Sequence, residues 1–179
     1  ASPLPERKRP EETTAAGLEP LAVPMSVAGF GPKTTAFLAD STGLVPVRGG
    51  SGKGGDTKDG KAKPRKWAGG DSVSIVLASG DNAIAANGTV TWVGGKKGEK
   101  LLAFGHPMYD SGPSKLPMAD ARVHHVLASV QRSFKISSPG TVQGTMIQDR
   151  QAAISLRTDV EPTLIPVHTE IQGADPDMP

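Results

Sequence analysis

The stretch 71–104, DSVSIVLASGDNAIAANGTVTWVGGKKGEKLLAF, decides the fold of this chain. It begins with alternating polar and apolar side chains and ends its first run apolar, which is typical of a half-buried strand. A turn at 79–82 follows, and 83–93 is rich in strand-forming side chains. A Gly- and Lys-rich loop at 94–98 then leads into a third apolar run at 100–104. The stretch therefore predicts three strands joined by short turns.

The rest of the chain is also patterned for strands. We expect them at 121–128, 133–137, 141–148, 152–157 and 165–171, with a further strand within 21–30 and one short helix near 32–41. The chain has 22 Gly and 16 Pro among 179 residues, and both residue types break helix interiors. The sequence therefore predicts a mainly β, barrel-like fold with one short helix and a disordered Gly/Lys-rich loop.

Changes in composition divide the chain into five segments. We interpret 1–20 as a flexible lead-in, 21–48 as the strand plus the short helix, 49–66 as a flexible basic linker, 67–173 as the β-barrel core and 174–179 as a loose end. The linker holds six Gly, five Lys, one Arg and two Asp, so its charge is +4. No aromatic side chain is interleaved with these charges, which favours a solvated linker over a polyanion-binding loop.

The composition also excludes several classes of function. The chain has no Cys, which excludes a disulfide framework, a thiolate metal site and a cysteine nucleophile. No apolar run approaches the roughly 20 residues of a membrane-spanning helix, so we expect no transmembrane segment in this chain. A net charge of +2 is too small to predict nucleic-acid binding. His124 and His125 are adjacent and would point to opposite faces of a strand, so we expect no metal site and no cofactor.

Short motifs between Gly70 and Ile154 give a more specific indication. They are GDSVS at 70–74, LASGD at 77–81, GTVTWV at 88–93, LAFGHPM at 102–108, PMADARVH at 117–124, SFK at 133–135, SPGTVQGT at 138–145 and QDR at 148–150. In order, spacing and residue type, this set resembles the peptidase domain of the SpoIVB (stage IV sporulation protein B) serine peptidase family. The resemblance implies peptide-bond hydrolysis through an acyl-enzyme. By analogy with trypsin-like peptidases, the chain would supply one barrel of two.

The resemblance implies that His106 is the catalytic general base, because the family's histidine follows Gly in the same motif. The residues themselves are compatible with this role, since an imidazole can take a proton from a serine hydroxyl near neutral pH. We expect Gly105 to permit a close backbone approach and Pro107 to stop the strand, which would place the ring at a rim. The alternative is a histidine satisfied by a backbone carbonyl in a turn.

A serine peptidase also needs an acid that orients the imidazole. Asp110 is our candidate, because it follows His106 by four residues and can lie across the same turn. Asp120 and Asp149 are alternatives, and the acid can also lie outside this chain. Because Asp149 precedes Arg150, we interpret it as part of a structural salt bridge or as a loop anchor.

The nucleophile is not evident in this sequence. The family's Gly-x-Ser-Gly-x-Pro motif is absent, and we interpret 111–113 (SGP) as a turn and 137–140 (SSPG) as a loop between strands. We therefore expect this chain alone to be inactive, with the serine in the remainder of the parent protein and a protein or peptide as substrate. The resemblance implies an extracytoplasmic location, in the periplasm, in the envelope or secreted. The alternative function is a non-catalytic structural or protein-binding module of a bacterial envelope protein.

Five large side chains are expected in or near the core. We interpret Trp67 and Trp92 as packing residues, and Met108, Met118 and Met146 as adaptable core filler.

Overall fold

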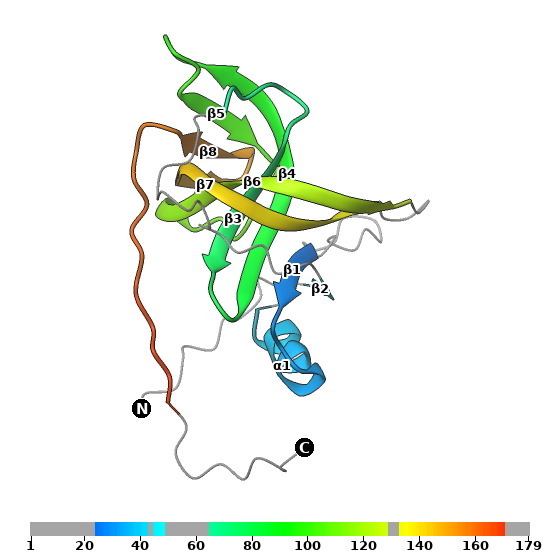
Figure 1. Cartoon of the computed structure of the whole chain (residues 1–179). Helices are drawn as coiled ribbons and strands as arrows, with labels where there is room; N and C mark the ends of the chain where they lie inside the picture. The colour runs from blue at the N-terminus through cyan, green and yellow to red at the C-terminus, as the bar shows by residue number, and fades with distance from the viewer. Residues whose placement is uncertain (1–23, 43–44, 49–64, 129–132, 171–179) are drawn as a thin grey trace.

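The computed structural model describes residues 24–42, 45–48, 65–128 and 133–170. This part is mainly β with one short helix, as the sequence predicts (Figure 1). The predicted lead-in at 1–20, nearly all of the predicted linker and the predicted loose end at 174–179 lie outside the described residues. The elements are β1 (Pro24–Ala28), α1 (Pro32–Thr42), β2 (Val45–Arg48), β3 (Ser72–Ala78), β4 (Ala83–Gly94), β5 (Lys100–Ala103), β6 (Gly112–Leu127), β7 (Phe134–Arg150) and β8 (Ala153–Arg157).

Six of the strands close into an antiparallel barrel. Their order around the ring is β4-β3-β6-β7-β8-β5, and β5 pairs back onto β4. The ring closes because β4 changes partners along its length. Its first part pairs with β3, and 90–94 pair with β5. Closure satisfies the backbone hydrogen bonds that an open sheet would expose at its edges. The predicted barrel is therefore confirmed.

The barrel encloses one apolar core. Trp67 is 6% exposed and Met118 and Met146 are fully buried, so their predicted packing roles are confirmed. Met108, in the loop after β5, is also buried against this core. The core cluster consists of Trp67, Val73, Ile75, Ala86, Val90, Leu101, Ala103, Met108, Met118, Met146, Ile154 and Leu156.

Trp92 does not lie in the core, and the prediction that it packs there is wrong. Its side chain is 50% exposed. A register shift in the pairing of β4 with β5 separates Val90 from Trp92, and a β-bulge of this kind reverses the inward and outward alternation. Val90 therefore faces the core, whereas the ring of Trp92 lies outside, over the backbone of Gly94.

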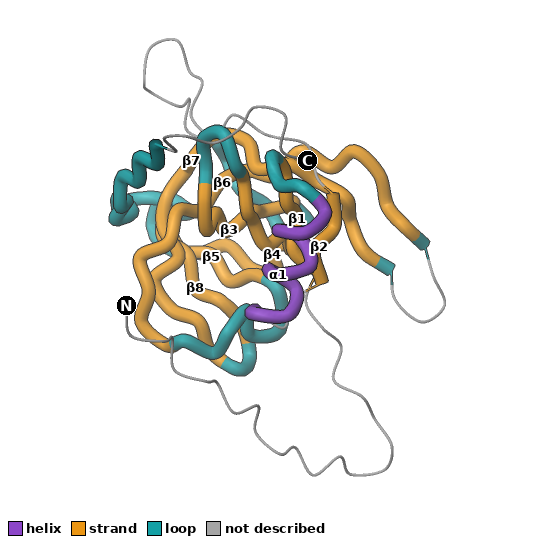
Figure 2. Tube along the Cα trace, turned by 90° about the horizontal axis from the view of Figure 1, so that it is seen from below, coloured by secondary structure: helices purple, strands orange, loops and turns teal. Residues whose placement is uncertain are grey.

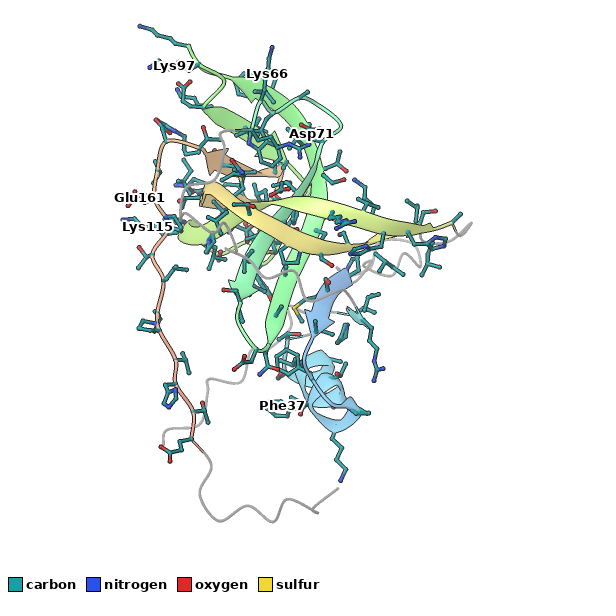
Figure 3. The ribbon with its side chains drawn as sticks, viewed as in Figure 1. Phe37, Lys66, Asp71, Lys97, Lys115 and Glu161 are labelled. Atoms are coloured by element: carbon teal, nitrogen blue, oxygen red, sulfur yellow. The ribbon has the colours of Figure 1, made fainter. Side chains whose placement is uncertain are left out.

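The strand β1 extends the sheet beyond the ring. It pairs antiparallel with the first residues of β4 and parallel with β2, which the sequence did not predict. Helix α1 confirms the helix expected near 32–41 and begins at Pro32, where a missing N–H costs nothing. The helix lies beside β1 and β2 (Figures 1 and 2). Phe37 points away from these strands and is 67% exposed (Figure 3).

Strands β6 and β7 are neighbours in the barrel wall and continue beyond it as a long two-stranded ribbon (Figure 1). The segment 137–140, predicted as a loop, lies inside β7, so that prediction is wrong. Pro139 and Gly140 are accommodated by register shifts opposite 119–121. The Asp120 carboxylate packs against Gly140 and accepts the N–H of Thr141 at 2.7 Å, replacing a regular ladder bond.

The segment after β8 has neither helix nor strand from 161 to 170, so the strand expected at 165–171 is wrong for its described residues. The segment is tied to the rest of the structure by hydrogen bonds, the first being that of Thr158 N–H, which donates to the Glu99 carbonyl at 3.0 Å. Thr145 Oγ1 donates to the Val160 carbonyl at 2.6 Å, and Thr163 N–H donates to the Lys115 carbonyl at 3.2 Å. Figure 3 shows Lys115 on this side of the barrel.

Candidate active site

His106 lies in the loop that connects β5 to β6. Phe104 and Gly105 directly precede it, and both have positive φ, at 74° and 76°. Gly105 suits this conformation because it has no Cβ. An added Cβ would meet nothing within 4 Å, so the close backbone approach predicted for this glycine is wrong. Positive φ is uncommon for an aromatic residue, and residues held in this way cluster at functional sites.

The imidazole of His106 is exposed and held from two sides. Its Nδ1 lies 2.8 Å from the carbonyl oxygen of Pro107. Its ring centroid lies 5.6 Å from that of Phe104. The Phe104 ring in turn lies directly on the backbone of Gly88, where an added Cβ would come within 2.2 Å of it. Gly88 therefore provides the space for the ring that supports His106.

The hydrogen bond to Pro107 fixes the tautomer of the ring. A carbonyl oxygen only accepts, so Nδ1 must carry the proton and donate it. In the neutral ring Nε2 then keeps its lone pair, and no described residue is hydrogen-bonded to it. The imidazole is thus satisfied by a backbone carbonyl and still has the protonation pattern of a general base.

Asp149 anchors the loop that carries His106. Its carboxylate is fully buried at the end of β7. Oδ1 accepts from Met108 N–H at 2.9 Å, and Oδ2 accepts from Tyr109 N–H at 2.7 Å and from the N–H and hydroxyl of Ser111 at 3.3 Å each. Of the structural roles predicted for Asp149, the loop anchor is confirmed. The carboxylate orients the loop rather than the imidazole.

Neither of the other two acids is hydrogen-bonded to the His106 ring within the described residues. Asp110 is exposed, has φ of 54° and, within the described residues, forms no hydrogen bond with His106. Its assignment as the orienting acid stays a prediction. The Asp120 carboxylate accepts a hydrogen bond from the backbone N–H of Thr141 on β7.

A pocket of about 250 Å³ borders His106. It lies between β1, β4 and the ribbon strand β7. The residues that line it are Pro24, Met25, Ser26, Val47, Asn87, Gly88, Thr89, Phe104, His106, Ser133, Lys135, Ile136 and Ser137. Apolar and polar side chains from strands far apart in the sequence therefore meet beside the imidazole, as in many ligand-binding pockets.

Lys135 contributes an ammonium group to this pocket. Nζ donates to Thr89 Oγ1 at 2.7 Å and to Ser72 Oγ at 3.0 Å. Partial burial lowers the pKa of Lys135 below its ordinary value, because desolvation disfavours the charged form. No carboxylate of the described residues pairs with it.

The sequence did not single out Lys135 or Ser137 as site residues. Residues two apart on a strand share a face, so a strand that runs continuously from 134 to 150 places both side chains toward the pocket. The strand predicted at 133–137 already contains both residues, but no local pattern indicated that β1 and β4 would lie beside it and form the pocket.

The ribbon also pairs a serine hydroxyl with an imidazole. His124 Nε2 on β6 lies 2.7 Å from Ser138 Oγ on β7. The spacing suits a nucleophile and its base. However, Ser138 is only 5% exposed, which leaves little room for a substrate carbonyl.

Two searches of the described residues bear on other functions. No group of three or more metal-ligating side chains is gathered there, and no helix there is both long and apolar enough to cross a membrane. Comparisons of the chain with protein-family models, with curated proteins and with solved structures gave no match.

Proposed function

We propose that this chain is part of a serine endopeptidase resembling the SpoIVB family and supplies its general base, His106. One observation carries the proposal. An exposed imidazole borders a pocket, and its Nδ1 is committed to a backbone carbonyl, so that Nε2 is left to accept a proton. The nucleophilic serine would come from the remainder of the parent protein, and the expected location is extracytoplasmic.

In the proposed reaction, the part of this chain is to accept and return protons at Nε2 of His106. As the serine hydroxyl attacks the carbonyl carbon of the scissile peptide bond, its proton passes to Nε2 of His106. The tetrahedral intermediate then collapses, the C–N bond breaks, and Nε2–H protonates the leaving amine. A water molecule repeats the sequence on the acyl-enzyme, which releases the acid and restores the serine. The Pro107 carbonyl stays hydrogen-bonded to Nδ1–H and stabilises the imidazolium in each half-reaction.

The surroundings of His106 support this use of the ring. Phe104 limits its rotation, and the buried carboxylate of Asp149 fixes the backbone that follows it. A catalytic imidazole must be held close to its productive orientation.

Fluorophosphonate labelling of the full-length parent tests the proposal. We expect a serine outside this chain to be labelled, and we expect His106→Ala to abolish the labelling. His168→Ala is the matched control, because His168 is also exposed but lies in the segment after β8. Equal labelling of all three proteins would exclude His106 as the base.

Two further outcomes separate the alternatives. A folded parent that is not labelled at all would support the non-catalytic structural or protein-binding module. Labelling that is lost in Ser138→Ala, and not in His106→Ala, would identify Ser138 and His124 as the reactive pair.

A further inference from the structure

The pocket beside His106 carries a positive charge that the described residues do not balance. Lys135 lines it, and none of the described residues that line it is acidic. An ammonium has three N–H donors. Ser72 and Thr89 take two of them, so one donor remains for a further acceptor.

A second observation on the same strand points to a missing partner. Ser137 is 1% exposed, and its Oγ has no hydrogen-bond partner among the described residues. Buried hydroxyls are nearly always hydrogen-bonded, and each exception calls for an explanation. Ser137 lines the pocket and lies two residues from Lys135, so both side chains face it.

The two unfilled donors define the ligand chemistry. An ammonium and a hydroxyl that line the same partly desolvated pocket are suited to an anionic oxygen acceptor, and charge-assisted bonds of this kind are the strong ones. A volume of about 250 Å³ is below the roughly 300–1,000 Å³ of pockets for drug-sized ligands. It suits one residue of a peptide.

We propose that this pocket binds a carboxylate of a peptide, with the Lys135 ammonium as counter-ion and the Ser137 hydroxyl as hydrogen-bond donor. As a substrate preference this inference rests on the peptidase function proposed above, with His106 at the border of the same pocket. The binding itself needs no catalysis and can be measured on this chain alone. The carboxylate is either an acidic side chain or the C-terminus of the peptide.

The test is a titration of the ¹⁵N-labelled full chain with four short peptides, followed by amide chemical shifts. Acetyl-Gly-Ala-Glu-Ala-Gly-amide is compared with its Gln counterpart, which isolates the side-chain carboxylate. Acetyl-Gly-Ala-Ala-Ala-Gly with a free C-terminus is compared with its amide, which isolates the terminal one. We expect one charged peptide to bind about tenfold more tightly than its neutral counterpart. The shifts should centre on Asn87, Thr89, Lys135 and Ser137.

Two variants assign the donors. Lys135→Met keeps the aliphatic stem and is expected to remove the preference for the charged peptide, whereas Lys96→Met in an exposed loop is the matched control. Ser137→Ala removes a buried, unpaired hydroxyl, so it should weaken carboxylate binding several-fold while leaving the melting temperature unchanged or higher. A merely structural role of Ser137 would instead lower the melting temperature and leave the peptide preference intact.

The inference is overturned if neither charged peptide binds more tightly than its amide counterpart, or if Lys135→Met and Ser137→Ala both retain the preference. These outcomes differ from a failure of the peptidase function. Carboxylate binding without fluorophosphonate labelling would place the site in a non-catalytic binding module. Labelling without carboxylate binding would leave the peptidase standing and remove the substrate class.

Discussion

Replacing Asp149 with Asn is expected to lower the free energy of unfolding by about 3 kcal/mol, although the two side chains have nearly the same shape. Asn retains one carbonyl oxygen, which can still accept from Met108 N–H. Its NH₂ group takes the place of Oδ2, however, and there it meets the N–H groups of Tyr109 and Ser111. Donors then face donors in a buried site.

The magnitude follows from these two backbone groups. A buried donor that loses its acceptor costs about 1–3 kcal/mol. Removal of a buried charge recovers part of this cost, and the Ser111 hydroxyl can rotate to accept from the new NH₂ group. A net loss of about 2–4 kcal/mol remains. For a domain of this size it should lower the melting temperature by about 10 °C or more.

Urea denaturation followed by tryptophan fluorescence measures the change, because Trp67 is buried in the barrel core. Asp110→Asn is the matched control. It makes the same chemical change in the same loop on an exposed carboxylate, and Asn tolerates positive φ. We expect the control to change stability by less than about 0.5 kcal/mol. An equally small effect of Asp149→Asn would refute the loop anchor. In the parent protein, Asp149→Asn should also reduce fluorophosphonate labelling, because the loop that holds His106 loses its support.

Three further predictions concern other parts of the site and the barrel. Gly88→Ala should displace the Phe104 ring and reduce labelling of the parent several-fold, because the new Cβ would lie 2.2 Å from a ring carbon; unchanged labelling would mean that the ring does not support His106. Trp67→Ala should cost about 3–5 kcal/mol, whereas Trp92→Ala should cost less than about 1 kcal/mol, because only the first is in the core; urea denaturation of both variants decides, and equal costs would contradict the bulge in β4. The hydrogen bonds from Arg157 lower the pKa of Asp159. This pair should therefore stabilise the fold at pH values above the ordinary Asp pKa and lose that contribution as the pH falls through the lowered pKa. Carbon NMR titration of Asp159 checks the direction, and Arg157→Gln should raise the pKa of Asp159.

Local pattern was enough to predict most of the strands. The alternation at 71–77 and the β-branched run at 83–93 became β3 and β4 within one or two residues. A helix was predicted near 32–41 because Pro32 can begin a helix, and α1 spans Pro32–Thr42. These signals are local, since each depends on residues that are close neighbours in the sequence.

The candidate site was predictable only in part. The motif at 102–108 directed attention to His106, and the sequence offered both a general base and a histidine satisfied by a carbonyl. In the structure, Nδ1 of His106 is hydrogen-bonded to the Pro107 carbonyl, and this hydrogen bond leaves Nε2 available. Lys135 and Ser137 were missed, because they become site residues only when β1 and β4 lie beside β7 and close the pocket.

The sequence by itself determined the class of fold, the positions of most strands and a few core side chains such as Trp67, Met118 and Met146, because strand propensity and alternation act over a few residues. Only the tertiary structure decided that Trp92 faces outward, since a single bulge between β4 and β5 reverses the alternation. Only the tertiary structure brought β1, β4 and β7 together around one pocket beside His106. Contacts between strands so far apart in the sequence depend on register and closure, and no local pattern encodes them.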